Sequence, residues 1–196
     1  MVAQQYFIRD AWRWPLLLAA NLNTPDGLHI AFADGIPLVA LVLKLLAPLL
    51  PEGFQGIGLW YGIAFALQPV AAVWALRGTG ERRWLPAFGV ALLAAGMPAW
   101  LARYGHAALT GHFLILVGLG FYLRLLRRPR DLPLWLAAVL AQVATMLVHP
   151  YLAVMTLALL AAVPATLLLR RDRACVRRNA PEPWRFRRDA AGSACR

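Results

Sequence analysis

Residues 56–76 read GIGLWYGIAFALQPVAAVWAL, an apolar run without a charged side chain. A helix of about 20 such residues crosses the hydrocarbon core of a bilayer, which is about 30 Å thick. Similar runs follow it at residues 85–101, 109–126, 132–148 and 151–169. The pattern predicts an all-α, polytopic transmembrane protein with a five-span bundle over residues 56–169.

The composition also favours a membrane protein over a soluble one. The 196 residues are 61% hydrophobic and 15% charged, whereas soluble domains carry about 25% charged residues. The net charge of +11 raises the question of nucleic-acid binding. The arginines, however, flank the apolar runs and do not alternate with polar and aromatic residues. We therefore expect membrane lipid as a partner, and no nucleic acid.

The arginines predict the orientation of the chain. They gather in the loops at 77–84 and 124–131 and in the tail from residue 170. Five alternating spans place all three groups on one side of the membrane. Because basic loops stay in the cytoplasm, this side is predicted to be cytoplasmic, in the cytoplasmic (inner) membrane of a bacterium. The links near 102–108 and 149–150 then face outward.

The chain outside the spans differs in composition at its two ends. Residues 170–196 are rich in arginine and hold both cysteines, and we expect a disordered, basic cytoplasmic tail. Its composition also resembles the out-of-frame reading of a GC-rich gene, which suggests a frameshifted or truncated product. Residues 1–55 are predicted to form an outward loop. Within it, IPLVALVLKLLAPLL at 36–50 is predicted to lie in the membrane interface as a helix, the alternative being a sixth span.

Several stretches carry a resemblance to one family. They are YFIRDAWRWPL at 6–16, NLNTPDGLHIAFADGIPLVALVLKLL at 21–46, FQGIGLWYGIAFALQ at 54–68, GHAALTGHFLIL at 105–116 and HPYLAVM at 149–155. They resemble an uncharacterised bacterial multi-pass family, a domain of unknown function that looks related to the GT-C glycosyltransferases. Those enzymes take sugars from polyprenyl-phosphate carriers on the outer side of the membrane.

The resemblance implies a partial GT-C-like bundle and an outward loop with an interfacial helix. It implies that spans are missing before Met1 and after Leu169, so that the chain is an N-terminal fragment. GT-C enzymes usually place an acidic residue just after their first span. In this family we expect that residue immediately before the position of Ala3, where this sequence has none, and activity of the chain alone is therefore in question.

Glycosyl transfer from a lipid phosphate needs a carboxylate base and groups that hold the phosphate. Asp34 is the predicted catalytic residue, with a helix cap as the alternative role. The predicted substrate-binding residues are Arg9, His29, Arg103, His106 and His149. Lys44 could also bind a lipid phosphate. Snorkelling to lipid headgroups is the alternative for Arg9, Arg103 and Lys44, and an ordinary interfacial position is the alternative for the histidines.

Three local expectations complete the interpretation. No metal or cofactor is expected, because the six-residue spacing of His106 and His112 is not a ligand pattern on one helix. Asp10 is expected to pair with Arg13. Gln68 and Gln142 are expected to hydrogen-bond between helices.

Two other functions compete with a glycosyltransferase-like protein. The first is a non-enzymatic scaffold or a subunit of a polysaccharide assembly or export complex, which needs no particular residues. The second is a transporter, which would usually place ionisable residues in mid-span. The predicted spans have essentially none, and this argues against ion coupling.

Overall fold

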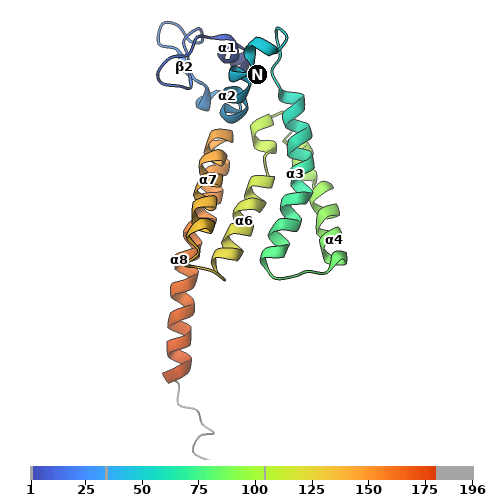
Figure 1. The fold of residues 1–196 in the computed structure, drawn as a ribbon, viewed down its shortest axis with the longest axis vertical. Helices are drawn as coiled ribbons and strands as arrows, with labels where there is room; N and C mark the ends of the chain where they lie inside the picture. The colour runs from blue at the N-terminus through green and yellow to red at the C-terminus, as the bar shows by residue number, and fades with distance from the viewer. Residues whose placement is uncertain (1, 34, 104, 180–196) are drawn as a thin grey trace, which may run out of the picture.

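The computed structural model describes residues 2–33, 35–103 and 105–179, and nearly all of its elements are helices (Figure 1). The α-helices are α1 (Val2–Arg9), α2 (Pro37–Leu45), α3 (Ile57–Gly78), α4 (Trp84–Ala95), α5 (Pro98–Ala102), α6 (Phe113–Leu125), α7 (Leu132–Val148) and α8 (Pro150–Asn179). The 3-10 helices are η1 (Ile30–Phe32), η2 (Ala47–Leu49) and η3 (Ala107–Thr110). Strands β1 (Leu18–Ala19) and β2 (Leu28–His29) pair antiparallel. The predicted all-α fold class is confirmed.

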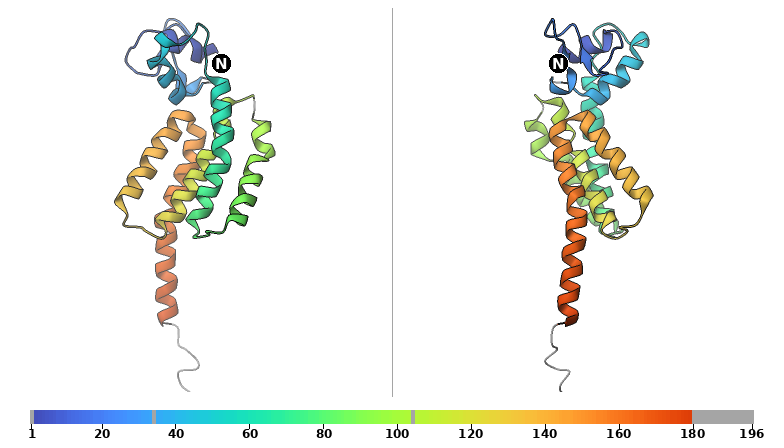
Figure 2. Two further views of the ribbon diagram at one scale, coloured as in Figure 1. Left: turned by 45° about the vertical axis from the view of Figure 1, so that its right-hand side comes forward. Right: turned by 90° about the vertical axis from the view of Figure 1, so that its left-hand side faces the viewer.

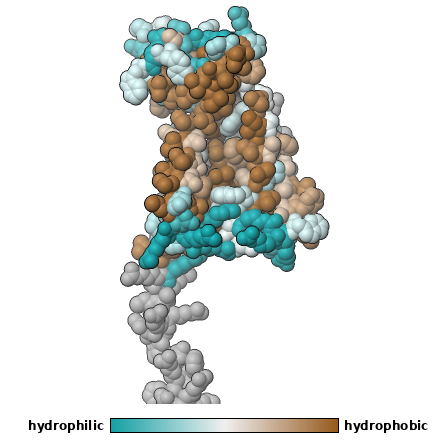
Figure 3. All heavy atoms as spheres, in the orientation of Figure 1, coloured by the Kyte–Doolittle hydropathy of each residue, from teal (hydrophilic) through white to brown (hydrophobic). Residues whose placement is uncertain are grey.

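Helix α6 stands at the centre of the bundle. It packs against α3, α7 and α8, and α4 packs on α3 (Figure 2). The segment before α3 lies over the end of the bundle where α3 begins, and α8 extends past the opposite end (Figure 1). Large apolar side chains of α3, α4, α7 and α8 point outward, and they give the middle of the bundle an apolar surface (Figure 3).

Within the described residues, three helical segments are long and apolar enough to cross a membrane: Ile57–Gly78, Ala107–Leu125 and Pro150–Arg170. The predicted runs at 85–101 and 132–148 also form helices, but these are shorter. The chain is thus a polytopic helical membrane protein, and the count of five spans stays a prediction.

The run at 85–101 departs from the predicted single helix. Helix α4 ends at Ala95, Gly96 follows it, and α5 starts at Pro98. Proline has no N–H and disfavours helical backbone in the residue before it, so the helix stops ahead of Pro98. The run at 85–101 therefore forms two helices, α4 and α5, where the sequence predicted one span. By contrast, Pro69 and Pro164 lie inside continuous helices.

The C-terminal boundary also differs from the prediction. Helix α8 continues to Asn179, so residues 170–179 of the predicted disordered tail are helical, and Cys175 lies within this extension. Extending an existing helix needs no new nucleation, and no proline occurs in the chain between Pro164 and Pro181. Residues 180–196, with Cys195, lie outside the described residues.

The N-terminal segment, residues 2–55, is held together by buried polar contacts. The Gln4 side chain accepts a hydrogen bond from the Ile36 N–H (2.9 Å) and donates one to the Gln55 carbonyl (2.7 Å). Ile36 is the N-cap residue of α2, and its side chain packs with Trp60 of α3 in the main core. Gln4 therefore links α1, α2 and the entry to α3. The expected pair of Asp10 and Arg13 is confirmed at 3.0 Å.

Helix α2 occupies part of the predicted 36–50 helix, and η2 follows it. Nine helical residues extend about 14 Å, far less than the hydrocarbon core, so α2 does not cross a bilayer. Lys44 does not snorkel, because its side chain is only 4% exposed. Its Nζ donates to the Ala11 carbonyl (3.3 Å) and lies 3.9 Å from the centre of the Phe7 ring. Burial lowers the pKa of Lys44, and the charge of Asp10 opposes that effect.

Small residues line the contacts between the spanning helices. Ala64, Ala71 and Ala75 of α3 are buried, and so are Gly118 and Gly120 of α6. This is the usual pattern in membranes, where helices associate through close backbone approach and hydrogen bonds because lipid is as apolar as their side chains. Gln142 forms such a hydrogen bond, since it donates to the Ala153 carbonyl at 2.7 Å, as expected. Gln68 of α3 donates to the sulfur of Met97, between α4 and α5, at 3.9 Å.

Replacing Gly120 with alanine tests the contact between α3 and α6. A methyl group at this position would collide with the Trp74 ring, which is itself packed against Phe121 and Arg124. We expect G120A to destabilise the bundle by about 1–3 kcal/mol, as overpacking of a core does. G62A is the matched control, because its methyl group meets no atom within 4 Å. Equal thermal midpoints of the two variants in detergent would contradict the observed packing.

Candidate functional site

A cavity of about 360 Å³ lies at the end of the bundle that carries the N-terminal segment. We call it the histidine cavity. Its polar lining consists of Arg103, His112, His149 and Tyr151, and its apolar lining of Leu109, Ile115, Leu152 and Met155. Its volume falls in the range of small-molecule sites, which combine an apolar wall with a few polar groups.

His112 reaches the cavity because α3 fixes the chain just before α6. The Trp60 Nε1–H donates to the Ala107 carbonyl (2.8 Å) and to the Thr110 hydroxyl (3.1 Å), and all three groups are buried. These bonds hold η3, and His112 follows as the N-cap residue of α6. The His112 Nδ1 is buried and has no hydrogen-bond partner among the described residues. A bound group that offers a donor or an acceptor would satisfy it.

His149 occupies the turn between α7 and α8. Its backbone is extended, and its N–H donates to the Thr145 carbonyl at the end of α7. Its Nδ1 accepts a hydrogen bond from the Tyr151 N–H at 3.1 Å, so the side chain caps the start of α8. A ring whose Nδ1 accepts carries its proton on Nε2 in the neutral state, which makes Nε2 a donor.

The charge of the cavity favours anions. Arg103 is exposed at its rim, and a guanidinium stays charged at any ordinary pH. No carboxylate lines the cavity among the described residues. An arginine beside two imidazoles forms charge-assisted hydrogen bonds with phosphate or carboxylate oxygens.

The structure brings together only part of the predicted site. Arg103 and His149 line the histidine cavity, as does His112. The sequence analysis had considered His112 only as a metal ligand and had rejected that role. His106 precedes η3 and is exposed, but it does not line the cavity. Tyr151 was missed, because nothing in the sequence distinguishes it from other interfacial tyrosines.

Arg9 and His29 lie in the N-terminal segment, away from this cavity. The Arg9 guanidinium donates to the carbonyls of Ala47, Leu50 and Pro51 at 2.8–3.1 Å, so it holds the chain around η2. His29 lies in β2 with its ring 5.7 Å from that of Phe32, and its buried Nδ1 has no partner among the described residues. Asp34 lies outside the described residues.

Nothing in the described chain suggests a metal centre. No group of three or more histidine, cysteine, aspartate or glutamate residues that could hold a metal ion occurs in residues 2–33, 35–103 and 105–179. The arginine at the rim of the histidine cavity would also repel a cation. The lining of the cavity therefore favours an anion over a cation.

Residues 1–183 match a family described as a domain of unknown function (DUF6311). No curated protein and no solved structure matches the chain.

Replacing Trp60 with phenylalanine tests how the cavity is positioned. The variant keeps an aromatic ring in the core but loses the N–H that binds η3. We expect it to be destabilised by about 1–2 kcal/mol and to exchange amide hydrogens faster over residues 105–112. W84F is the matched control, because Trp84 is 75% exposed. Unchanged exchange over residues 105–112 in W60F would show that the tryptophan does not hold the cavity wall.

Proposed function

The chain belongs to the DUF6311 family of domains of unknown function, and we propose that it is a membrane glycosyltransferase-like protein of the GT-C type. In this proposal the histidine cavity holds the phosphate of a polyprenyl-phosphate sugar, and the sugar is used to assemble a cell-surface glycan. The chain lies in the cytoplasmic membrane of a bacterium, with the cavity on the outer side.

The observation that supports the proposal is the lining of the histidine cavity, which combines an apolar wall with polar donors. A polyprenyl phosphate has an apolar chain attached directly to an anionic headgroup. Leu109, Ile115 and Met155 offer the cavity's apolar wall, and Arg103 and His149 offer donors beside it. Hydrogen bonds to a phosphate are stronger beside an apolar wall, because less water competes for the donors.

The orientation is supported by the distribution of charge. The end of the bundle opposite the cavity carries Arg77, Arg82, Arg124, Arg127 and Arg128, which form a hydrophilic band below the apolar surface (Figure 3). The positive-inside rule assigns such an end to the cytoplasm. The histidine cavity then opens toward the outer side, where GT-C enzymes meet their lipid-linked donors.

In the proposed glycosyl transfer, binding of the phosphate and removal of the proton are carried out by different residues. Arg103 and His149 bind the phosphate, and they stabilise the charge that develops on it as the bond to the sugar breaks. Asp34 takes the proton of the acceptor hydroxyl, whose oxygen forms the new bond to the anomeric carbon. The polyprenyl phosphate leaves with the electron pair of the broken bond. The role of Asp34 rests on its place in the sequence, just before the predicted interfacial helix, and on the need for a carboxylate base.

Binding of the donor can be measured directly with the purified protein in detergent, using a photoreactive polyprenyl phosphate. We expect R103A to weaken labelling about tenfold, because it removes a charge-assisted hydrogen bond to the phosphate. R130A, which removes an exposed arginine at the other end of the bundle, is the control. Equal labelling of the wild type, R103A and R130A would refute the cavity as the donor site and would favour the scaffold function.

A second substitution separates chemistry from binding. We expect D34N to label as strongly as the wild type but to abolish glycan modification by cells that carry the gene, because the amide cannot accept the hydroxyl proton. Immunoblotting of the membrane fraction checks that the variant is inserted. Normal glycan modification with a fully expressed D34N variant would remove the catalytic role of Asp34.

A further inference from the structure

A second cavity, of about 220 Å³, lies at the basic end of the bundle, and we call it the arginine cleft. Its charged lining consists of Arg77, Arg82, Arg124, Arg127, Arg128 and Asp131. Arg77 lies in the last turn of α3 and Arg82 in the connection to α4, whereas the others come from the end of α6 and the connection to α7. Two arginine groups that are about 50 residues apart in the sequence therefore converge on one hollow.

Three of the arginines form the walls of the arginine cleft. Arg77 donates to the carbonyls of Glu81 and Arg83, and Arg127 donates to that of Thr79. Arg124 donates to the Trp74 carbonyl at 2.7 Å and lies over the Trp74 ring, with 3.8 Å between its guanidinium carbon and the ring centre. These bonds fix the backbone around the cleft, and they leave the charges of all three side chains in place.

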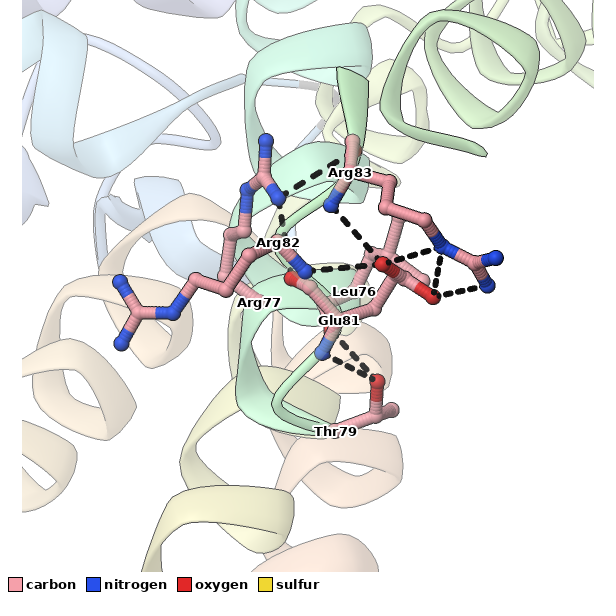
Figure 4. A network of polar contacts seen from close by, with 6 residues as sticks. All are labelled: Leu76, Arg77, Thr79, Glu81, Arg82 and Arg83. Carbon is pink, nitrogen blue, oxygen red and sulfur yellow. Dashed lines mark hydrogen bonds and ion pairs between the residues drawn. The ribbon is translucent and has the colours of Figure 1, made fainter. Parts of the chain in front are cut away.

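The other two arginines are available to a ligand. The Arg82 side chain points away from its neighbours and makes no hydrogen bond to the described residues (Figure 4). The adjacent Glu81 does not neutralise Arg82, because its carboxylate is bound by Arg83 at 2.7 Å. That hydrogen bond lowers the pKa of Glu81 to about 2. Arg128 approaches Asp131 only at 4.0 Å, the limit of an ion pair.

The arginine cleft is strongly cationic as a result. The lining holds five arginines and one aspartate, so four positive charges in it are uncompensated. Asp131 is also partly committed elsewhere, since one of its oxygens accepts the Leu134 N–H as the N-cap of α7. Rings of arginine that face one hollow bind phosphate through bidentate hydrogen bonds. Basic pockets between the cytoplasmic ends of spanning helices bind the headgroups of anionic lipids.

We propose that the arginine cleft binds a phosphate-bearing anion. Arg82 and Arg128 bind the anion directly, and the fixed side chains of Arg77, Arg124 and Arg127 line the site. The ligand chemistry is a phosphodiester or phosphomonoester with one or two negative charges. An anionic lipid headgroup and a free phosphate compound share this chemistry. The site is separate from the histidine cavity and does not depend on the function proposed for it.

The test measures binding of cardiolipin, a lipid with two phosphodiesters, to the purified full-length chain by native mass spectrometry. We expect the wild type to retain one cardiolipin and the R82A/R128A variant to bind it about tenfold more weakly or worse, since two charge-assisted contacts are lost. Both side chains are exposed and hold no structural hydrogen bond, so the thermal midpoint is expected to stay unchanged.

The matched control is R130A/R170A, which removes two exposed arginines from the same end of the bundle but outside the lining of the arginine cleft. We expect it to change cardiolipin binding by less than about twofold, as isolated exposed charges do. Equal weakening in the two double variants would overturn the proposal in favour of a diffuse charge effect. Unchanged binding in R82A/R128A would also overturn it.

Competition distinguishes the two sources of the anion. If millimolar pyrophosphate displaces cardiolipin from the wild type, the site recognises the phosphate itself and a free phosphate compound fits it. If pyrophosphate does not compete, the acyl chains contribute and the ligand is a lipid headgroup. Both results support a phosphate site, provided that R82A/R128A has lost the binding.

Discussion

The contact between α3 and α6 is the interaction on which the rest of the structure depends. In a hydrocarbon environment apolar side chains gain nothing by leaving lipid, so two helices hold together only where their backbones approach closely and polar groups bind across the gap. The small residues of α3 and Gly120 of α6 allow that approach, whereas Gly118 of α6 faces Thr156 of α8. A tryptophan of α3 then fixes each end of α6: the Trp60 N–H binds η3 before it, and the Trp74 carbonyl and ring hold Arg124 near its end.

This arrangement explains why the two cavities lie at opposite ends of one bundle. The histidine cavity opens beside the start of α6, and the arginine cleft opens beside its end. The first joins an apolar wall to a few donors, which suits an amphipathic ligand. The second is lined mainly by guanidinium groups, which suits a compact anion. Because the helix between them is the same, the spacing of the two sites is fixed by the length of α6.

Hydropathy alone was sufficient to predict where the apolar helices of the bundle lie, because the need to satisfy backbone groups favours a helix for an apolar run in lipid. The break at Gly96 and Pro98 was missed, since α3 and α8 show that a proline does not always end a helix. The roles of Lys44 and Arg9 were also missed. A cation near an interface usually snorkels, but here the rings and carbonyls of other elements satisfy both side chains. Such partners are set by tertiary structure and leave no pattern in the sequence. For the same reason, Arg103 and His149 could be suggested from the sequence, but not their meeting in one cavity with Tyr151.

The unequal lengths of the bundle helices have a consequence for the surrounding lipid. Helix α3, with 22 residues, extends about 33 Å, whereas α7, with 17, extends about 26 Å, and the broken segment Trp84–Trp100, made of α4 and the start of α5, is no longer than α7. The short helices lie on opposite sides of the bundle (Figure 2). A bilayer that matches α3 is therefore too thick for both flanks, and the annular lipid beside them must compress or tilt its chains. This hydrophobic mismatch costs a fraction of a kcal/mol per Å, and it gives the protein a preference for thin regions of a membrane.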